Sequence, residues 1–329
     1  MADRVKVAIA SRDLAALKKA LKKAAVPVHA KVVGQAAGAG WLAGLRAFDA
    51  HGADFNAIYR NYRPMHALIQ ENPHAGGSST PERVRCLEWL LEHGADPQLQ
   101  GAWPLASAIV IAAGVGEGAY VRVLKAHGAS AGADNIFAAA ALGETTRVQK
   151  MLARLPSLAT AREQGVMTAL MCCASSRLGG DRPQTAAALT TIAEMLIEAG
   201  AEVTATARSW SHDVDAVYFA VSTGQRDVLH ILIDNGASPT AALTTAVWRS
   251  DFETADYLIG RGADVNAARS DGKPLLNNLI RWGQFKPAKW LLTRGARVDV
   301  ADERGWTAVE QALSRGNAGM IAAIDKARR

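Results

Sequence analysis

The chain has 329 residues, with 37 Lys and Arg residues against 31 Asp and Glu residues, and a formal net charge of +6 at pH 7. Hydrophobic residues make up 49% of it and charged residues 21%, which is typical of a folded soluble protein and excludes a disordered one. The longest apolar stretch, 106–115, is about half a membrane span, so we expect a buried helix there and no membrane insertion. The mild basic charge permits an acidic partner and does not require nucleic acid.

The N-terminus lacks the apolar run of a signal peptide. The three cysteines, Cys86, Cys172 and Cys173, are odd in number and do not have the spacing of metal ligands. Both features favour a reduced, cytoplasmic setting.

A Gly-Ala step follows an apolar segment of helical periodicity at seven places. The glycines of these steps are Gly52, Gly94, Gly128, Gly200, Gly236, Gly262 and Gly295. If the longest interval contains one further unit, the mean spacing is about 35 residues, which is the mark of a repeat architecture. We expect each glycine to end a helix in the left-handed conformation, which costs glycine little.

In chain order, the pattern predicts about ten helix pairs whose second helices end near residues 24, 51, 93, 127, 155, 199, 235, 261, 294 and 327. Segments 1–25 and 296–329 are the expected capping units. The Gly-, Pro- and Ser-rich segments 71–81 and 177–184 are expected to be insertions between the two helices of a unit. One short helix pair cannot bury its own apolar face, so neighbouring pairs must stack.

These repeats resemble those of the ankyrin family, whose unit of about 33 residues starts its first helix with T-P-L-H-x-A and ends its second with L-L-x-x-G-A-D-V-N. The best matches to the helix end are L-I-G-R-G-A-D-V-N at 258–266, L-L-E-H-G-A-D at 90–96 and L-L-T-R-G-A at 291–296. The helix start is degraded, as in R-P-M-H-A at 63–67, and T-P-L-H never occurs whole. The resemblance implies an all-α fold, an ankyrin-repeat solenoid with short finger loops, forming a single array over residues 1–329. Tetratricopeptide repeats have a similar period, but their W-x-x-L-G-x-x-Y pattern is absent.

The histidines, the cysteines and the glycine-rich segment that could support catalysis or ligand binding each have a structural explanation. His51, His93 and His127 each precede a Gly-Ala step, where a donor suits the last carbonyls of a helix, and His66 occupies the histidine position of the ankyrin motif. Cys172 and Cys173 lie in an apolar helix, and the glycine-rich segment 114–118 lacks the Lys-Ser/Thr of a phosphate loop. We therefore expect no catalytic residue, no metal and no cofactor, and we expect that the protein is not an enzyme.

In the ankyrin family, partner contacts vary in the finger loop, just before the first helix, and at the last two positions of that helix. Mapping these positions by resemblance gives candidates rich in Trp and Arg, the residues that dominate binding hot spots. The candidates are Tyr62, Arg208, Trp210, Trp248, Arg249, Arg269, Lys273, Arg281, Trp282, Trp306 and Arg315. The alternative is that these tryptophans fill gaps between irregular units, which applies most to Trp103 and Trp306. Trp41, Trp89 and Trp290 fall in second helices, where packing explains them.

The sequence thus favours a monomeric scaffold or regulator that binds another protein, an acidic one included, on a concave surface bearing Trp and Arg. A nucleic-acid-binding protein is an alternative, although the interleaved acidic residues argue against it. The Ala- and Arg-rich composition suits a bacterial source, which leaves a host-directed effector, an immunity protein and a housekeeping scaffold open. An enzyme is the least favoured reading, and a buried His, Asp and Cys cluster would be needed to revive it.

Overall fold

A computed structural model describes residues 2–22, 28–70, 80–102, 105–132, 135–163, 166–208, 213–266 and 273–328. In these ranges the chain is mostly helical, with strands of only two residues each. The chain divides into two compact units, Met1–Glu202 (unit 1) and Val203–Arg329 (unit 2). A single array over residues 1–329 stays a prediction.

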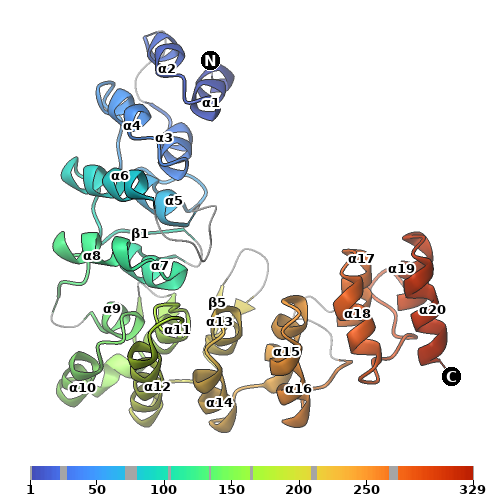
Figure 1. Cartoon of the computed structure of the whole chain (residues 1–329). Coiled ribbons are helices and arrows are strands. Elements are labelled where there is room, and N and C mark those ends of the chain that lie inside the picture. Colours follow the sequence, from blue (N-terminus) through green and yellow to red (C-terminus); the bar gives the residue numbers. More distant parts are fainter. Residues whose placement is uncertain are drawn as a thin grey trace. The chain divides into compact units, whose positions relative to one another are not determined.

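Unit 1 consists of helix pairs that pack in chain order (Figure 1). The pairs are α1 (Ala2–Ala10) with α2 (Leu14–Leu21), α3 (Ala30–Gly38) with α4 (Leu42–Asp49), α5 (Pro64–Gln70) with α6 (Pro81–Glu92), α7 (Ala108–Val115) with α8 (Gly118–Ala126), α9 (Ile136–Ala141) with α10 (Thr145–Arg154), and α11 (Ala169–Ala174) with α12 (Pro183–Glu198). Each first helix contacts the first helix of the next pair. A short 3₁₀ helix, η1 (Pro156–Ala159), follows α10.

Unit 2 has four further pairs. They are α13 (Ala216–Thr223) with α14 (Arg226–Asp234), α15 (Pro239–Trp248) with α16 (Phe252–Gly260), α17 (Leu275–Arg281) with α18 (Phe285–Leu292), and α19 (Ala308–Ser314) with α20 (Ala318–Ala327). Here α13 packs on α15, and α17 packs on α19. Between these two halves of unit 2, Phe252 stacks on Trp290 with ring centroids 4.9 Å apart, and both Arg294–Asp256 hydrogen bonds are 3.0 Å or shorter.

The strands form antiparallel pairs in the connections that precede a first helix. They are β1 (Gln100–Gly101) with β2 (Ala106–Ser107), β3 (Arg162–Glu163) with β4 (Met167–Thr168), and β5 (Ala207–Arg208) with β6 (Asp213–Val214). We call these connections finger loops. Each hairpin satisfies backbone groups that the loop would otherwise leave unpaired.

The expected helix ends are confirmed. All seven glycines of the Gly-Ala steps have φ between +71° and +94°. The N–H of the following alanine returns to the carbonyl five residues earlier, as in the 2.9 Å bond from Ala263 to Leu258, which is the Schellman arrangement. His51, His93 and His127 place Nδ1 within 2.9 Å of the carbonyl four residues before them, so their role at helix ends is confirmed too.

The described second helices end within three residues of the predicted positions. The largest difference is in the first helix pair, where α2 ends at Leu21 rather than near residue 24. Segment 177–184 is mostly loop, since α11 ends at Ala174 and α12 begins at Pro183. Gly116 forms the left-handed turn between α7 and α8, as expected for segment 114–118. Most of the other expected insertion, 71–81, lies outside the described residues, and α6 begins at Pro81.

A buried arginine forms hydrogen bonds that connect neighbouring helix pairs of unit 1. Arg83, in α6, is 7% exposed. Its Nη1 donates to the carbonyl of Gly38 at 2.8 Å, its Nη2 donates to the carbonyl of Leu68, and its Nε donates to the hydroxyl of Tyr120 at 3.2 Å. These partners lie in three different helix pairs, and two of them are carbonyls at the ends of first helices, which lack intrahelical donors.

Candidate partner-binding surface

The structure describes nine of the eleven residues that the sequence analysis selected. Trp210 and Arg269 lie outside the described residues. Tyr62 belongs to unit 1, where it is half-buried and forms an isolated antiparallel bridge with Tyr59. The other eight lie in unit 2.

Two groups of these residues lie apart within unit 2. Trp248 ends α15 and is half-buried, while the next residue, Arg249, is exposed. Helix α15 packs on α13 and touches α18, but it makes no extensive contact with α17. Arg208, in β5, is exposed and forms an ion pair with Asp213 at 3.1 Å. Trp248 and Arg249 are therefore not joined to Arg281 and Trp282 through an extensive contact of their first helices.

The remaining residues gather around α17 and α19, and we call Lys273, Arg281, Trp282, Trp306 and Arg315 the C-terminal cluster. Trp282, which follows α17, is 64% exposed. Arg315, which follows α19, donates from Nη2 to the carbonyl of Arg281, so the ends of the two helices are joined. Trp306 is 41% exposed. Lys273 Nζ lies 3.5 Å from Glu303 Oε1, in the loop that carries Trp306.

The loop that carries Trp306 is held by hydrogen bonds from two sides. Asp302 Oδ1 accepts the N–H groups of Arg304 at 2.9 Å and of Trp306 at 3.0 Å. Asn277, buried on α17, donates to the carbonyls of Val300 at 2.9 Å and of Trp306 at 2.8 Å. Partial burial acts to raise the pKa of Asp302, but these backbone donors and the nearby arginines outweigh it and lower that pKa. The loop is therefore ordered without a partner, which reduces the entropy lost on binding.

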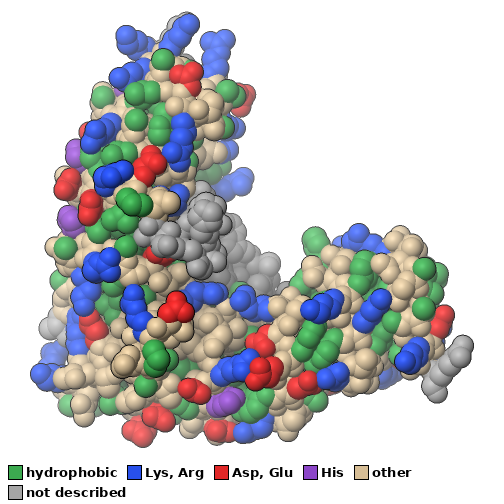
Figure 2. Space-filling model, in the orientation of Figure 1, with side chains coloured by type: hydrophobic (Ala, Val, Ile, Leu, Met, Phe, Trp, Pro, Cys, Tyr) green, Lys and Arg blue, Asp and Glu red, His purple; other side chains and the backbone are tan. Residues whose placement is uncertain are grey.

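The arginines of this cluster differ in ion pairing from those of the second helices of unit 2. There, arginines pair with carboxylates of neighbouring helix pairs: Arg226 with Glu253, Arg261 with Asp234, and Arg294 with Asp256. By contrast, neither Arg281 nor Arg249 forms an ion pair with any described residue. Figure 2 shows Lys and Arg side chains interspersed with Asp and Glu over the visible face.

The tryptophans assigned to packing behave as expected. Trp89 in α6 and Trp41, which directly precedes α4, are buried. Trp290 is half-buried between Phe252 and Arg294, whose guanidinium lies 4.6 Å from the ring centroid. Trp282 differs from all three, because no comparable packing removes its ring from solvent.

Leu313, in α19, is 59% exposed, although its position in the sequence predicts a buried side chain. Leu313 lies one helix position before the residues that align with Arg281 and Trp282, where the corresponding Ile280 is buried. An apolar residue at that position predicts a buried side chain, so the sequence carries no signal of its exposure.

Three groups that could perform catalysis, His66, Cys172 and Cys173, are buried. His66 is fully buried, and burial together with the charge of Arg63 lowers its pKa to about 4, while its Nε2 lies 3.2 Å from the carbonyl of Ala106. Burial raises the pKa of Cys173 to about 12 and that of Cys172 well above its ordinary value, so both stay protonated and poorly nucleophilic.

Within the described residues, no three His, Cys, Asp or Glu side chains are grouped as metal ligands would be. In the same ranges, no helix has both the length and the apolar character needed to span a bilayer.

Comparison with known proteins gives distant similarities. No protein-family model matches the chain. Over 102 residues it is 29% identical to the transient receptor potential cation channel subfamily A member 1 homolog of Caenorhabditis elegans, a match that covers 29% of this chain and 8% of that protein. Over 108 residues it is 34% identical to the E3 ubiquitin-protein ligase hecd-1 of the same organism, covering 32% of this chain and 4% of that protein. The chain therefore spans less than a tenth of either relative.

Among solved structures, the chain is similar to one in the complex of the Bd0816 predatory endopeptidase from Bdellovibrio bacteriovorus with immunity protein Bd3460. The match covers 58% of this chain and 96% of the other, with 21% sequence identity and a TM-score of 0.44. A likeness at that level does not establish a common fold.

Proposed function

We propose that the chain is an ankyrin-type repeat scaffold that catalyses no reaction and binds another protein through the C-terminal cluster of unit 2. The repeat assignment is supported by the stacked helix pairs and by the seven glycine-ended helices in register with the L-L-x-x-G-A-D pattern. In this proposal the protein is cytoplasmic and monomeric. Its two distant relatives each share one similar segment of about 100 residues with the chain.

The observation that carries this proposal is the exposure of Trp282 beside Arg281, which forms no ion pair within 4.0 Å with a described residue. When a partner covers the exposed ring of a tryptophan, the complex is stabilised by about 25 cal/mol for each Å² of apolar surface removed from water. Its neighbour Arg281 can pair with a carboxylate or stack on an aromatic ring of the partner. Trp306 is a second exposed tryptophan of the cluster, and Arg315 joins the ends of α17 and α19 through its bond to the carbonyl of Arg281.

The basic residues of the cluster favour a partner surface that carries carboxylates. Lys273 already has Glu303 nearby, so the charge available to a partner comes mainly from Arg281. A nucleic-acid partner would require a longer continuous run of cations, because affinity for phosphates grows with the number of phosphates neutralised.

The test is to photo-crosslink partners to the full-length chain in a lysate of its source cells and to repeat this with Trp282→Ala plus Arg281→Ala. A hot-spot tryptophan contributes about 2 kcal/mol or more, so we expect recovery of the partner to fall by more than about tenfold. Val7→Ala, which truncates an exposed apolar residue in unit 1, is the matched control and should leave recovery unchanged. Equal recovery with the double variant would contradict the proposal, and recovery of nucleic acid in place of protein would favour the alternative.

A further inference from the structure

A hairpin turn in the connection between α4 and α5 has an unusual backbone conformation. Tyr59 and Tyr62 exchange two backbone hydrogen bonds, of 2.9 and 3.0 Å. The two residues between them, Arg60 and Asn61, have φ of +48° and +69°, which is the pattern of a type I′ turn. Glycine and asparagine are the usual central residues of such a turn, whereas an arginine with positive φ is strained. Strained residues gather at binding sites, so the position of Arg60 indicates a use for its side chain.

Three side chains with nitrogen donors surround the ring of Tyr59. The guanidinium carbon of Arg60 lies 5.6 Å from the ring centroid, and Lys31 Nζ lies 5.5 Å from it. The His29 ring packs edge-on against the same ring, with centroids 5.5 Å apart. We call His29, Lys31, Tyr59 and Arg60 the Tyr59 cluster. Two of its members belong to the start of α3 and two to the connection before α5, so the stacking of two helix pairs creates it.

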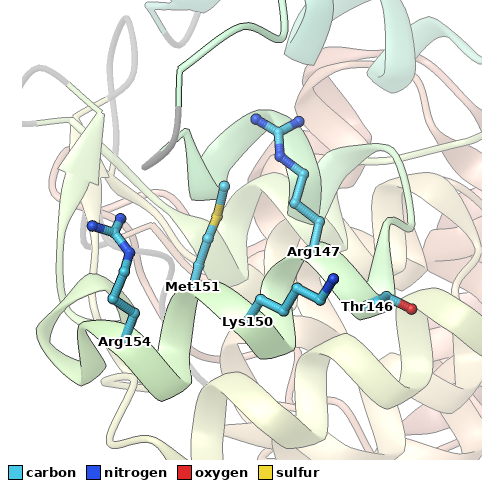
Figure 3. Close-up of a pocket in the computed structure, with 5 residues that line it drawn as sticks. All are labelled: Thr146, Arg147, Lys150, Met151 and Arg154. Atoms are coloured by element: carbon cyan, nitrogen blue, oxygen red, sulfur yellow. The ribbon is translucent and has the colours of Figure 1, made fainter.

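The cations of the Tyr59 cluster lack a counter-charge in the part of the chain that the structure describes. Neither Lys31 nor Arg60 forms an ion pair within 4.0 Å with a described residue, and Arg60 and His29 are exposed. His29 Nδ1 accepts the N–H of Lys31 at 3.1 Å, so the neutral ring carries its proton on Nε2, which can donate to an anion. Arg147, shown on α10 in Figure 3, differs from them, because it pairs with Glu144 at 2.9 Å.

The turn is fixed in place by the next connection of unit 1. The carbonyl of Asn61 accepts the N–H of Ala102, and Arg63 Nε donates to the carbonyl of Gln100 at 2.7 Å. The turn therefore has its conformation without a partner, which reduces the entropy lost on binding. Ile58, which directly precedes Tyr59 in the chain, is 49% exposed.

We propose that the Tyr59 cluster is a docking site for an extended acidic segment of another protein. Two carboxylates of that segment pair with Lys31 and Arg60, and an apolar side chain of it contacts Ile58. Both cations lie within 5.6 Å of one ring centroid, and alternate residues of an extended segment place their side chains on one side about 7 Å apart. A nucleic-acid backbone needs a longer track of cations, because its affinity grows with the number of phosphates neutralised. The site is in unit 1, so it does not rest on the function proposed for the C-terminal cluster of unit 2.

The test measures binding of a fluorescent acidic peptide to the full-length chain by anisotropy at about 150 mM salt. The peptide has about ten residues, with Glu at alternate positions and Leu at one end. We expect Lys31→Gln plus Arg60→Gln to weaken binding about tenfold, because two ion pairs are lost. The control, Lys18→Gln plus Arg122→Gln, removes the same two charges at exposed positions on α2 and α8 and should alter binding less than about twofold.

A further variant separates binding from a structural role of Arg60. Asparagine suits the left-handed conformation at this position of the turn, so Arg60→Asn should raise the melting temperature while it weakens binding of the peptide. A lower melting temperature would show that Arg60 serves the fold, and it would count against the proposal.

Histidine resonances report where the peptide binds. The ring resonances of His29 should shift on titration, while those of buried His66 should not. Trp282→Ala should bind the peptide normally, which separates this site from the C-terminal cluster. The proposal would be overturned by the absence of saturable binding to the unaltered chain, by equal weakening in both double variants, by unmoved His29 resonances, or by tighter binding of a single-stranded DNA of about 20 nucleotides.

Discussion

A carboxylate buried beside a finger loop gives unit 1 a pH-dependent stability. Glu163, in β3, is 8% exposed. Burial raises its pKa, and the neighbouring Ser107 and Gln100 oppose burial without outweighing it. Within the described residues, Glu163 Oε2, Ser107 Oγ and Gln100 Nε2 are buried without hydrogen-bond partners. Cys172 lies near enough for Glu163 to raise the pKa of its thiol. An acid whose pKa is raised on folding is favoured in its protonated form, so its ionised form destabilises the native state.

We predict that Glu163→Gln stabilises the protein at neutral pH. The gain should be complete above the raised pKa of Glu163. It should shrink as pH falls through that pKa and vanish below the ordinary Glu range near about 4.3, where the carboxyl is protonated in both states. Thermal unfolding of both proteins between about pH 4 and pH 8 measures the difference. A variant that is less stable at pH 8, or a gain independent of pH, would show that the ionised carboxylate is satisfied by its neighbours.

At the scale of the element, the ends of the second helices control the repeat. In α16, Gly260 is the last helical residue, whereas Gly262 lies two residues later with φ of +89°. A side chain at either glycine would meet no atom within 4 Å, so sterics with neighbours do not distinguish them. The difference between them is one of backbone conformation alone.

We predict opposite effects for the two alanine substitutions. Gly262→Ala should destabilise the protein by about 1 to 2 kcal/mol, because an L-residue is strained in the left-handed region. Gly260→Ala should stabilise it by up to about 1 kcal/mol, because alanine restricts the unfolded chain and favours helix. Denaturant unfolding of both variants measures this, and two changes of the same sign would refute the assignment of the helix end.

At the scale of the whole molecule, the division into two units implies that stability is local. Repeat arrays are stabilised by neighbouring contacts, so a defect affects its own neighbourhood first. Arg83 belongs to unit 1 and Gly262 to unit 2. Removing the Arg83 guanidinium leaves the carbonyls of Gly38 and Leu68 without their donor.

We predict that Arg83→Met destabilises unit 1 by about 2 to 4 kcal/mol, since buried carbonyls lose their partner. Hydrogen exchange should then accelerate in core segments of unit 1 and remain unchanged in α16–α20, while Gly262→Ala should produce the reverse pattern. Arg85→Met, at an exposed position on the same helix, is the control and should have little effect. Equal acceleration in both units would show that the chain unfolds as one cooperative block.

The sequence by itself determined the helix pairs, their ends and the histidines that serve those ends, because each of these depends on interactions within a few residues. Gly262 and His93 are examples: the left-handed turn and the bond to Trp89 need only their own helix. It also separated Trp41, Trp89 and Trp290 from the tryptophans that follow first helices. The position of Trp282 after a first helix was therefore predictable.

Only the tertiary structure decided which of these residues meet and which stay exposed. Trp248 and Trp282 belong to neighbouring helix pairs of unit 2 with similar sequence signals, yet α15 and α17 make no extensive contact with each other. The exposure of Leu313 depends likewise on whether another helix covers that face. Exposure is a property of distant packing, and a residue's local sequence does not encode which neighbours arrive.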